Sequence, residues 1–234
     1  MIKLMSLVEI DVNQFTPKRA VMKGFLKKGH RDNDIGDDIV LVKKVAIPVH
    51  KIKPTQSIIY TAKSIEMAYR PFEGDELYTI ISNDNHILDG HHRWASNMLK
   101  DPNTKMSGYK IDMNVHDLIH VLRAVGDAIG NPRQGAPVAS DINIFKAKIG
   151  DIEDIIYNGS HLKPGQFKPA EFQAWYEGIG RDEMNRRLKL IQRNKPLTTL
   201  DRTEMPVIKI NQVNFLNKLL KTGSVDINAP YAKS

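Results

Sequence analysis

The chain has 234 residues, of which 41% are hydrophobic and 26% are charged, and it contains no cysteine. This length and composition provide enough apolar surface for a folded core. The lack of cysteine excludes disulfides, zinc–thiolate centres and thiol nucleophiles. Lysine and arginine total 34 against 27 acidic residues, for a formal net charge of +7. Such an excess favours a polyanionic partner or a phosphorylated ligand.

Two features of the sequence bear on localisation. No stretch approaches the length of an apolar membrane span, and the N-terminal residues lack a long apolar run followed by a cleavage site. We therefore expect a cytoplasmic protein with no membrane partner, in the host cytoplasm if a phage encodes it.

The first third of the chain predicts short strands and one helix. Residues 1–38 read as an irregular lead-in with a short strand at 6–12 and an exposed basic, then acidic, loop at 27–38. Residues 40–42 and 45–49 have strand composition, and the proline at position 54 predicts a turn at 52–57. Thr61 is expected to cap a helix that reaches Tyr69 and ends at Pro71.

A hairpin and a second helix follow. Residues 77–81 and 86–88 are predicted strands about a turn at 82–85. A helix should run from His91 to about Lys100, because Trp94, Ala95, Met98 and Leu99 recur at helical spacing. Residues 110–115 are a further predicted strand. These elements predict a compact α+β domain over residues 39–116.

Residues 117–234 are predicted to form a mainly helical C-terminal region. Helical periodicity covers 117–129, 142–157, a short segment opened by Pro169, 181–193 and about 213–221. One stretch, 207–210, is strand-like. The chain is therefore expected to comprise a lead-in at 1–38, the α+β domain at 39–116 and a helical elaboration at 117–234.

The most informative residues are Asp89-Gly90-His91-His92-Arg93, where a strand passes into a helix. A helix start exposes backbone N–H groups and a positive dipole end, which bind anions and phosphate in particular. Gly90 allows close approach of a ligand to the backbone. Arg93 and the two histidines are expected to bond phosphate oxygens, and Asp89 to hold Mg²⁺ or accept a hydroxyl proton. The alternative is a structural helix cap with surface histidines.

Gln56 and Ser57 lie in the turn before the first predicted helix. The Gln56 amide is expected to contact a phosphate or a base edge, with Ser57 beside it, and a plain polar turn is the alternative.

Pro54-Thr55-Gln56 and Asp89–Trp94, with the strands and helices around them, resemble the ParB/sulfiredoxin fold over roughly residues 42–116. The resemblance implies a small mixed sheet with helices and a phosphate-binding cleft between the two motifs, filled in different branches by a nucleoside di- or triphosphate. Sulfiredoxins carry a cysteine in Gly-Cys-His-Arg, so their reaction is excluded here. Chromosome-partitioning proteins carry Gly-Glu-Arg-Arg and bind CTP, and His91 and His92 depart from that pattern.

Two other branches are nearer to this sequence. The free-serine kinases of this fold carry Asp-Gly-His-His-Arg, which Asp89 to Arg93 match residue by residue. Those kinases also use a glutamate in the first motif, where this chain has Gln56, and glutamine cannot act as a base. Phage and plasmid proteins described as ParB-like nucleases resemble the chain in both motifs.

These observations predict a nucleotide-binding ParB-like protein that hydrolyses a nucleoside phosphate or transfers its phosphoryl group, because phosphoryl transfer depends mainly on positioning and charge stabilisation. ATP or ADP is favoured over CTP, with Mg²⁺ at Asp89, and the ligand is a nucleotide or another phosphorylated small molecule. The predicted catalytic residues are Asp89, His91 and His92, and the predicted phosphate- or nucleotide-binding residues are Gln56, Ser57, Gly90, His91, His92 and Arg93.

Two alternatives stay open. One is a DNA-binding ParB-like protein of phage or plasmid type with nuclease activity. Its candidate DNA contacts lie on the basic face of the helix at 181–193, which with 169–177 has the order of a helix-turn-helix: Arg181, Arg186, Arg187, Lys189 and Arg193. The other alternative is a domain that binds a ligand without catalysis. His116 and His120 have metal-ligand spacing, but one pair is not a site.

Overall fold

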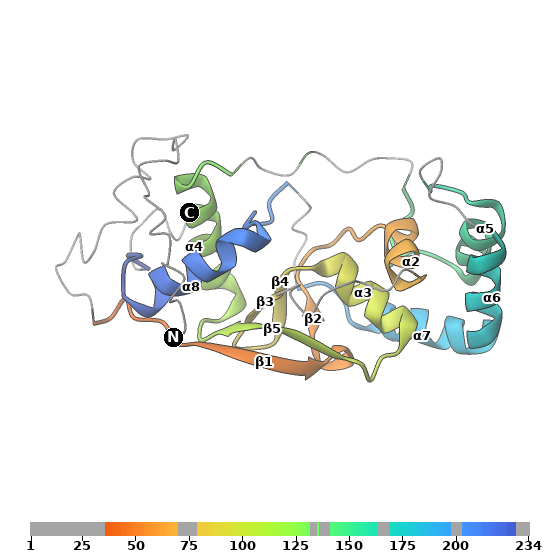
Figure 1. Cartoon of the computed structure of the whole chain (residues 1–234), viewed down its shortest axis with the longest axis horizontal. Coiled ribbons are helices and arrows are strands. Elements are labelled where there is room, and N and C mark those ends of the chain that lie inside the picture. Colours follow the sequence, from red (N-terminus) through yellow and green to blue (C-terminus); the bar gives the residue numbers. More distant parts are fainter. Residues whose placement is uncertain are drawn as a thin grey trace, which may run out of the picture.

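The computed structural model describes residues 36–69, 79–131, 135, 141–162, 169–197 and 203–227. These residues form a mixed five-stranded sheet with helices on both sides (Figure 1), so the protein is of the predicted α+β class. The predicted strand at 6–12, the basic patch at 27–31 and the predicted helix stop at Pro71 lie outside the described residues.

The sheet has the strand order β1-β5-β3-β4-β2. Its strands are β1 (Val42–Pro48), β2 (Lys53–Pro54), β3 (Thr79–Ser82), β4 (His86–Asp89) and β5 (Lys105–Ile111). β3 and β4 form the predicted antiparallel hairpin, and β1 pairs with β5 in the same sense. β3 runs parallel to β5, and β2 runs parallel to β4.

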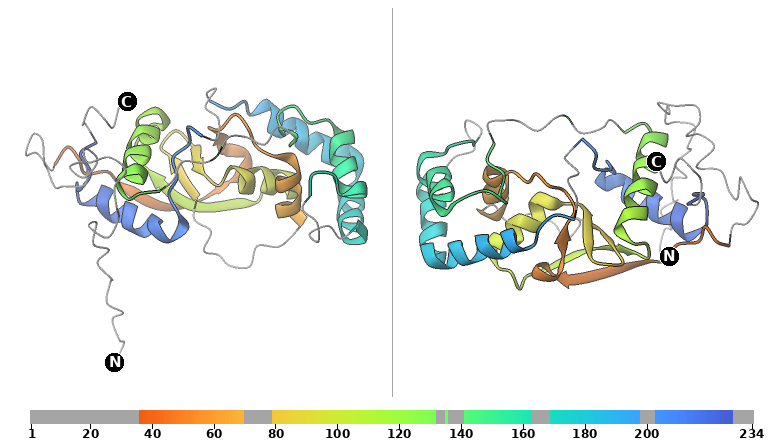
Figure 2. Two further views of the ribbon diagram at one scale, coloured as in Figure 1. Left: turned by 90° about the horizontal axis from the view of Figure 1, so that it is seen from above. Right: turned by 180° about the vertical axis from the view of Figure 1, so that it is seen from behind.

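Both faces of the sheet are covered, because successive side chains of a strand point to opposite faces. Ile80 and Leu88 belong to a core with α4 (Val115–Ala128) and α8 (Val213–Lys221). Ile81 and Ile87 belong to a second core, whose helices are α2 (Thr61–Tyr69), α3 (His91–Lys100), α5 (Ile149–Asn158), α6 (Pro169–Ile179) and α7 (Arg181–Arg193). Figure 2 shows α4 and α8 together at one end of the molecule and α5, α6 and α7 at the other.

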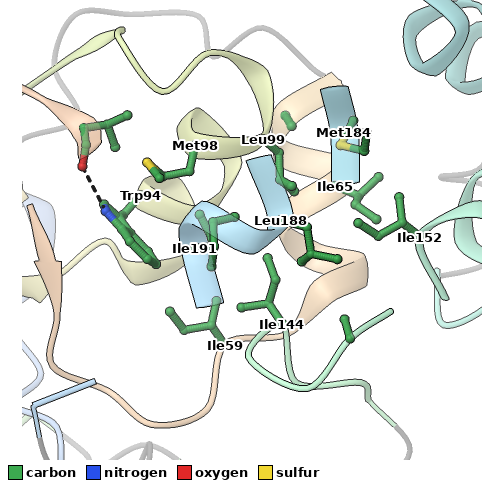
Figure 3. Close-up of a cluster of buried hydrophobic side chains, with 14 of the residues drawn as sticks. Ile59, Ile65, Trp94, Met98, Leu99, Ile144, Ile152, Met184, Leu188 and Ile191 are labelled. Carbon is green, nitrogen blue, oxygen red and sulfur yellow. Dashed lines mark hydrogen bonds between the residues drawn. The ribbon is translucent and has the colours of Figure 1, made fainter. Parts of the chain in front are cut away.

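Trp94 fixes the start of α3 within the second core. Its side chain is fully buried, and the indole N–H donates to the carbonyl oxygens of Val49 and Ile52, each at 3.1 Å. Figure 3 shows Trp94 in this core with one hydrogen bond from its indole nitrogen. The buried side chains of α7 that pack nearby are Met184, Leu188 and Ile191. Because Trp94 lies one turn after His91, this contact positions the motif against the chain before β2.

Several predicted boundaries are wrong. The strand expected at 110–115 is β5 and ends at Ile111, because the Asn114 side chain caps α4 by accepting from the Asp117 N–H at 3.1 Å. The helix expected from residue 142 begins at Ile149, since residues 142–144 bond to the chain before α2 instead. Pro54 lies in β2 rather than in a turn, and residues 207–210 join no strand of the described sheet.

Gly108→Ala is expected to destabilise the fold, because an added Cβ would lie 2.5 Å from the Thr79 carbonyl oxygen across β5 and β3. Overpacking of this kind costs about 1–3 kcal/mol. The measurement is the free energy of unfolding in urea. Gly150→Ala is the control, since nothing lies within 4 Å of a Cβ there and alanine favours helix. Equal stability of the two variants would contradict the close approach of β3 and β5.

Candidate functional site

A cavity of about 210 Å³ opens at the start of α3. It collects six of the predicted site residues, namely Gln56, Asp89, Gly90, His91, His92 and Arg93, whereas Ser57 is not part of its lining. The sequence reasoning missed five lining residues, which are Lys63, Met67, Leu88, Met205 and Pro206. The cavity therefore joins both predicted motifs with α2 and with a segment of the C-terminal half.

Gly90 sets the entry into α3. Its φ of 96° is left-handed, and it stands at the N-cap without a side chain to cap the helix. A Cβ at this position would lie 2.6 Å from Thr79 Oγ1, a hydroxyl that donates to the Asp89 carbonyl oxygen at 3.1 Å. Glycine thus meets both a backbone and a packing requirement, and it leaves the positive end of the helix beside the cavity.

His91 makes a buried structural contact. The ring is 5% exposed, and its Nε2 accepts from the backbone N–H groups of Thr55 at 3.3 Å and Gln56 at 3.1 Å. Burial lowers the pKa of His91 to about 3, against the opposing effect of a hydrogen bond to the Ile87 backbone. The ring is therefore neutral at physiological pH. Nε2 therefore faces the loop before α2, and the predicted phosphate-binding and catalytic roles of His91 stay predictions.

His92 makes a similar contact further along the same loop. Its Nε2 accepts from the Tyr60 N–H at 3.2 Å, and the centroids of the His92 and Tyr60 rings lie 5.7 Å apart. The two histidines thus hold both ends of residues 55–60 against α3. The predicted catalytic and phosphate-binding roles of His92 stay predictions, since its side chain also lines the cavity.

Asn143 holds the loop of residues 55–60 from the opposite direction. Its Nδ2 donates to the Ser57 carbonyl at 2.8 Å, and its Oδ1 accepts from the Ile59 N–H at 3.3 Å. The N–H of Thr61 donates to the Ile142 carbonyl at 2.8 Å. Nothing in the local sequence pointed to this role, because Asn143 lies more than 80 positions from its partners.

Gln56 is packed rather than extended into open space. It is 6% exposed, and its side-chain amide donates to the Ile58 carbonyl. The residue lines the cavity, but an amide has no proton to give or take in the pH range of the protein. The first motif therefore supplies shape and hydrogen bonding to the site and no general base.

Asp89 and Arg93 are the charged pair of the site. The Arg93 Nη2 donates to Asp89 Oδ2 at 3.2 Å, and the Arg93 side chain is 14% exposed against 44% for Asp89. Burial raises the pKa of the Asp89 carboxyl, and Arg93 opposes that shift. Asp89 is the one carboxylate among the described lining residues. Lys63, from α2, adds a second cation to the lining.

The basic helix α7 uses several of its arginines within the molecule. Arg181 pairs with Glu153 at 2.8 Å, and Arg186 pairs with Glu183 at 2.6 Å. Arg187, predicted to face outward, is 15% exposed and donates to the Leu99 carbonyl at 2.9 Å. Lys189 and Arg193 are exposed. DNA contact by this helix stays a prediction.

The described residues contain no group of three or more His, Cys, Asp or Glu that gathers as a metal site, and none of their helices is long and apolar enough to cross a membrane. His116 and His120 both lie on α4 without such a group.

Comparisons with protein-family models, with curated proteins and with solved structures find no match for this chain. The arrangement of the cavity is therefore the physical basis for assigning a function.

Acid is expected to destabilise the protein through His91. The unfolded ring takes up a proton near pH 6.5 and the folded ring only near pH 3, so stability is full above 6.5 and falls as the pH drops between these values. The loss is about 1.4 kcal/mol per pH unit, or about 2 kcal/mol at pH 5. Urea unfolding at pH 7, 6, 5 and 4 measures it.

His91→Gln keeps an acceptor without a titrating ring, so the dependence of its stability on pH should be shallower by this amount. His116→Gln, at an exposed position, should retain the wild-type slope. Should His91→Gln fail to fold, proton NMR of the wild type gives the answer, because a His91 ring that titrates near pH 6.5 contradicts the buried contact.

Proposed function

We propose that this protein is a ParB/sulfiredoxin-like nucleotide-binding enzyme that cleaves a phosphoanhydride of a nucleoside phosphate and passes the phosphoryl group to water or to a hydroxyl acceptor. The observation that carries the proposal is the convergence of Lys63, Arg93, the start of α3 and the carboxylate of Asp89 on one cavity. ATP and ADP are the favoured nucleotides.

Phosphate binding follows from the charges around the cavity. Arg93 presents a planar guanidinium that matches phosphate oxygens, and Lys63 provides a point charge from the neighbouring helix α2. The helix dipole of α3 adds to both at Gly90. Because His91 is neutral and bound to the loop, the positive charge at the site comes from Arg93 and Lys63.

Asp89 is suited either to accept a proton or to bind the metal ion. Its side chain is 44% exposed at the cavity, where the carboxylate is placed to accept a proton from the attacking water or hydroxyl. The attacking oxygen forms the new bond to phosphorus, the anhydride P–O bond breaks, and its electron pair leaves with the nucleoside phosphate. One carboxylate also agrees with Mg²⁺, which usually takes its other ligands from phosphate oxygens and water.

Binding is tested by isothermal titration with ATP, ADP and CTP, with and without Mg²⁺. The wild type is expected to bind ATP or ADP, and Lys63→Ala to weaken that binding about tenfold through loss of one charged contact. Lys189→Ala removes the same charge from an exposed position on α7 and should leave the affinity unchanged. Arg93→Gln is a second variant at the site. Failure of all three nucleotides to bind the wild type would overturn the proposal.

Turnover is tested by phosphate release from ATP and ADP with Mg²⁺, and by ³¹P NMR in the presence of serine as a hydroxyl acceptor. Asp89→Asn is expected to lower turnover about a hundredfold or more. Nucleotide binding without Mg²⁺ should persist in this variant, because a negative charge near the phosphates is lost. Asp182→Asn, at an exposed position on α7, is the matched control. Binding without turnover in the wild type supports a purely ligand-binding domain instead.

A further inference from the structure

The cavity has an apolar side as well as a charged one. The apolar side consists of Met67 from α2, Leu88 from β4, and Met205 and Pro206 from the segment before α8. Leu88 and Met205 are almost fully buried, whereas Met67 is partly exposed at the edge. Phosphate oxygens gain nothing from such a surface, so it fits the uncharged part of a ligand.

The segment that carries Met205 and Pro206 is firmly held on α4. The Arg123 guanidinium donates to the Glu204 carbonyl, and Asn131 Nδ2 donates to the Val207 carbonyl at 2.6 Å. A Cβ on Gly126 would lie 2.9 Å from that same Val207 oxygen, so glycine is what allows the close approach. The anchors on both sides fix the apolar wall before any ligand arrives, which reduces the entropic cost of binding.

The same Asn131 is itself held in place. It exchanges two hydrogen bonds with Gln212, at 2.8 and 3.1 Å, and both side chains are buried. Gln212 Oε1 also accepts from the Lys209 N–H at 2.9 Å. Both ends of residues 204–209 are therefore tied to the core beside α4, through hydrogen bonds separate from those that hold residues 55–60.

The size of the cavity limits what it encloses. About 210 Å³ is below the roughly 300 Å³ at which small-molecule pockets begin. A phosphate group at the charged end leaves room for only part of a nucleoside. Lys63 and Met67 lie one turn apart on the same face of α2, so a ligand that has a phosphate near Lys63 extends past Met67.

We propose that Met67, Met205 and Pro206 bind the nucleoside of the ligand, so that the site selects nucleoside phosphates over a bare phosphate chain. This rests on the proposed function, because it assumes that phosphate occupies the charged side. The thioether of Met67, which is partly exposed, contacts the flat face of the base, a favourable interaction for a polarizable sulfur, and Met205 and Pro206 complete the apolar side. The C-terminal half thereby supplies specificity to a site whose charges come from α2, β4 and α3.

The test compares ADP with pyrophosphate, both with Mg²⁺, by isothermal titration on the full chain. The wild type is expected to bind ADP about tenfold or more tightly than pyrophosphate. Met67→Ala should weaken ADP binding roughly 2- to 10-fold and leave pyrophosphate binding unchanged. Met67→Leu restores an apolar side chain and should recover most of the affinity. Leu41→Ala, which removes an exposed apolar residue outside the cavity lining, should change neither.

Three outcomes separate this inference from the proposed function. Equal affinities of the wild type for ADP and pyrophosphate overturn the inference and leave phosphate binding intact. An equal loss of affinity for ADP and for pyrophosphate in Met67→Ala also overturns it, since the substitution then affects the binding of the phosphates. If neither ligand binds the wild type, the proposed function fails together with the inference.

Discussion

The acceptance of two backbone N–H groups by the neutral imidazole of His91 is the contact on which the site depends. A protonated ring would present a donor to the amides of Thr55 and Gln56 and leave three donors facing one another in a buried place. Buried donors without acceptors are costly, so the folded state keeps the ring uncharged. His92 repeats the contact at Tyr60. Together the two rings connect the start of α3 to the loop that leads into α2, and so bring Gln56 and Lys63 to the same cavity.

Because of this connection, some groups of the motif and its loop are used in internal hydrogen bonds, and others face the cavity. The amides of Thr55 and Gln56 point at His91 and are not available to a phosphate. The cavity therefore offers a ligand the cations Arg93 and Lys63, the first turn of α3 and the carboxylate of Asp89. Of the two histidines in the motif, His91 makes a buried structural contact with the loop before α2. The positive charge that lines the cavity comes from Arg93, which belongs to the pentapeptide, and from Lys63, which does not.

The sequence predicted what depends on local pattern. The helices at 181–193 and 213–221, the hairpin at 82–85 and the helix at His91 follow from apolar spacing and turn residues, and all are present. The helix predicted from residue 142 begins only at Ile149, because residues 142–144 bond to residues 57–61, which no window of sequence reveals. The orientation of His91 was missed for the same reason. A helix start indicates an anion site, but burial of its first side chain depends on a loop 35 residues away.

The missed lining residues point to the role of the C-terminal half. α4 and α8 belong to the core on one face of the sheet, and α5 to α7 belong to the other core, where they pack against α2, α3 and one another. Both cores therefore draw on residues after 116. The backbone reflects this, because the Leu197 N–H donates to the Pro54 carbonyl and the Val40 N–H donates to the Leu220 carbonyl. Residues 205 and 206 reach the cavity through the same packing. A change in the contact between α4 and this segment therefore alters the apolar lining of the cavity without touching Arg93, Lys63 or Asp89.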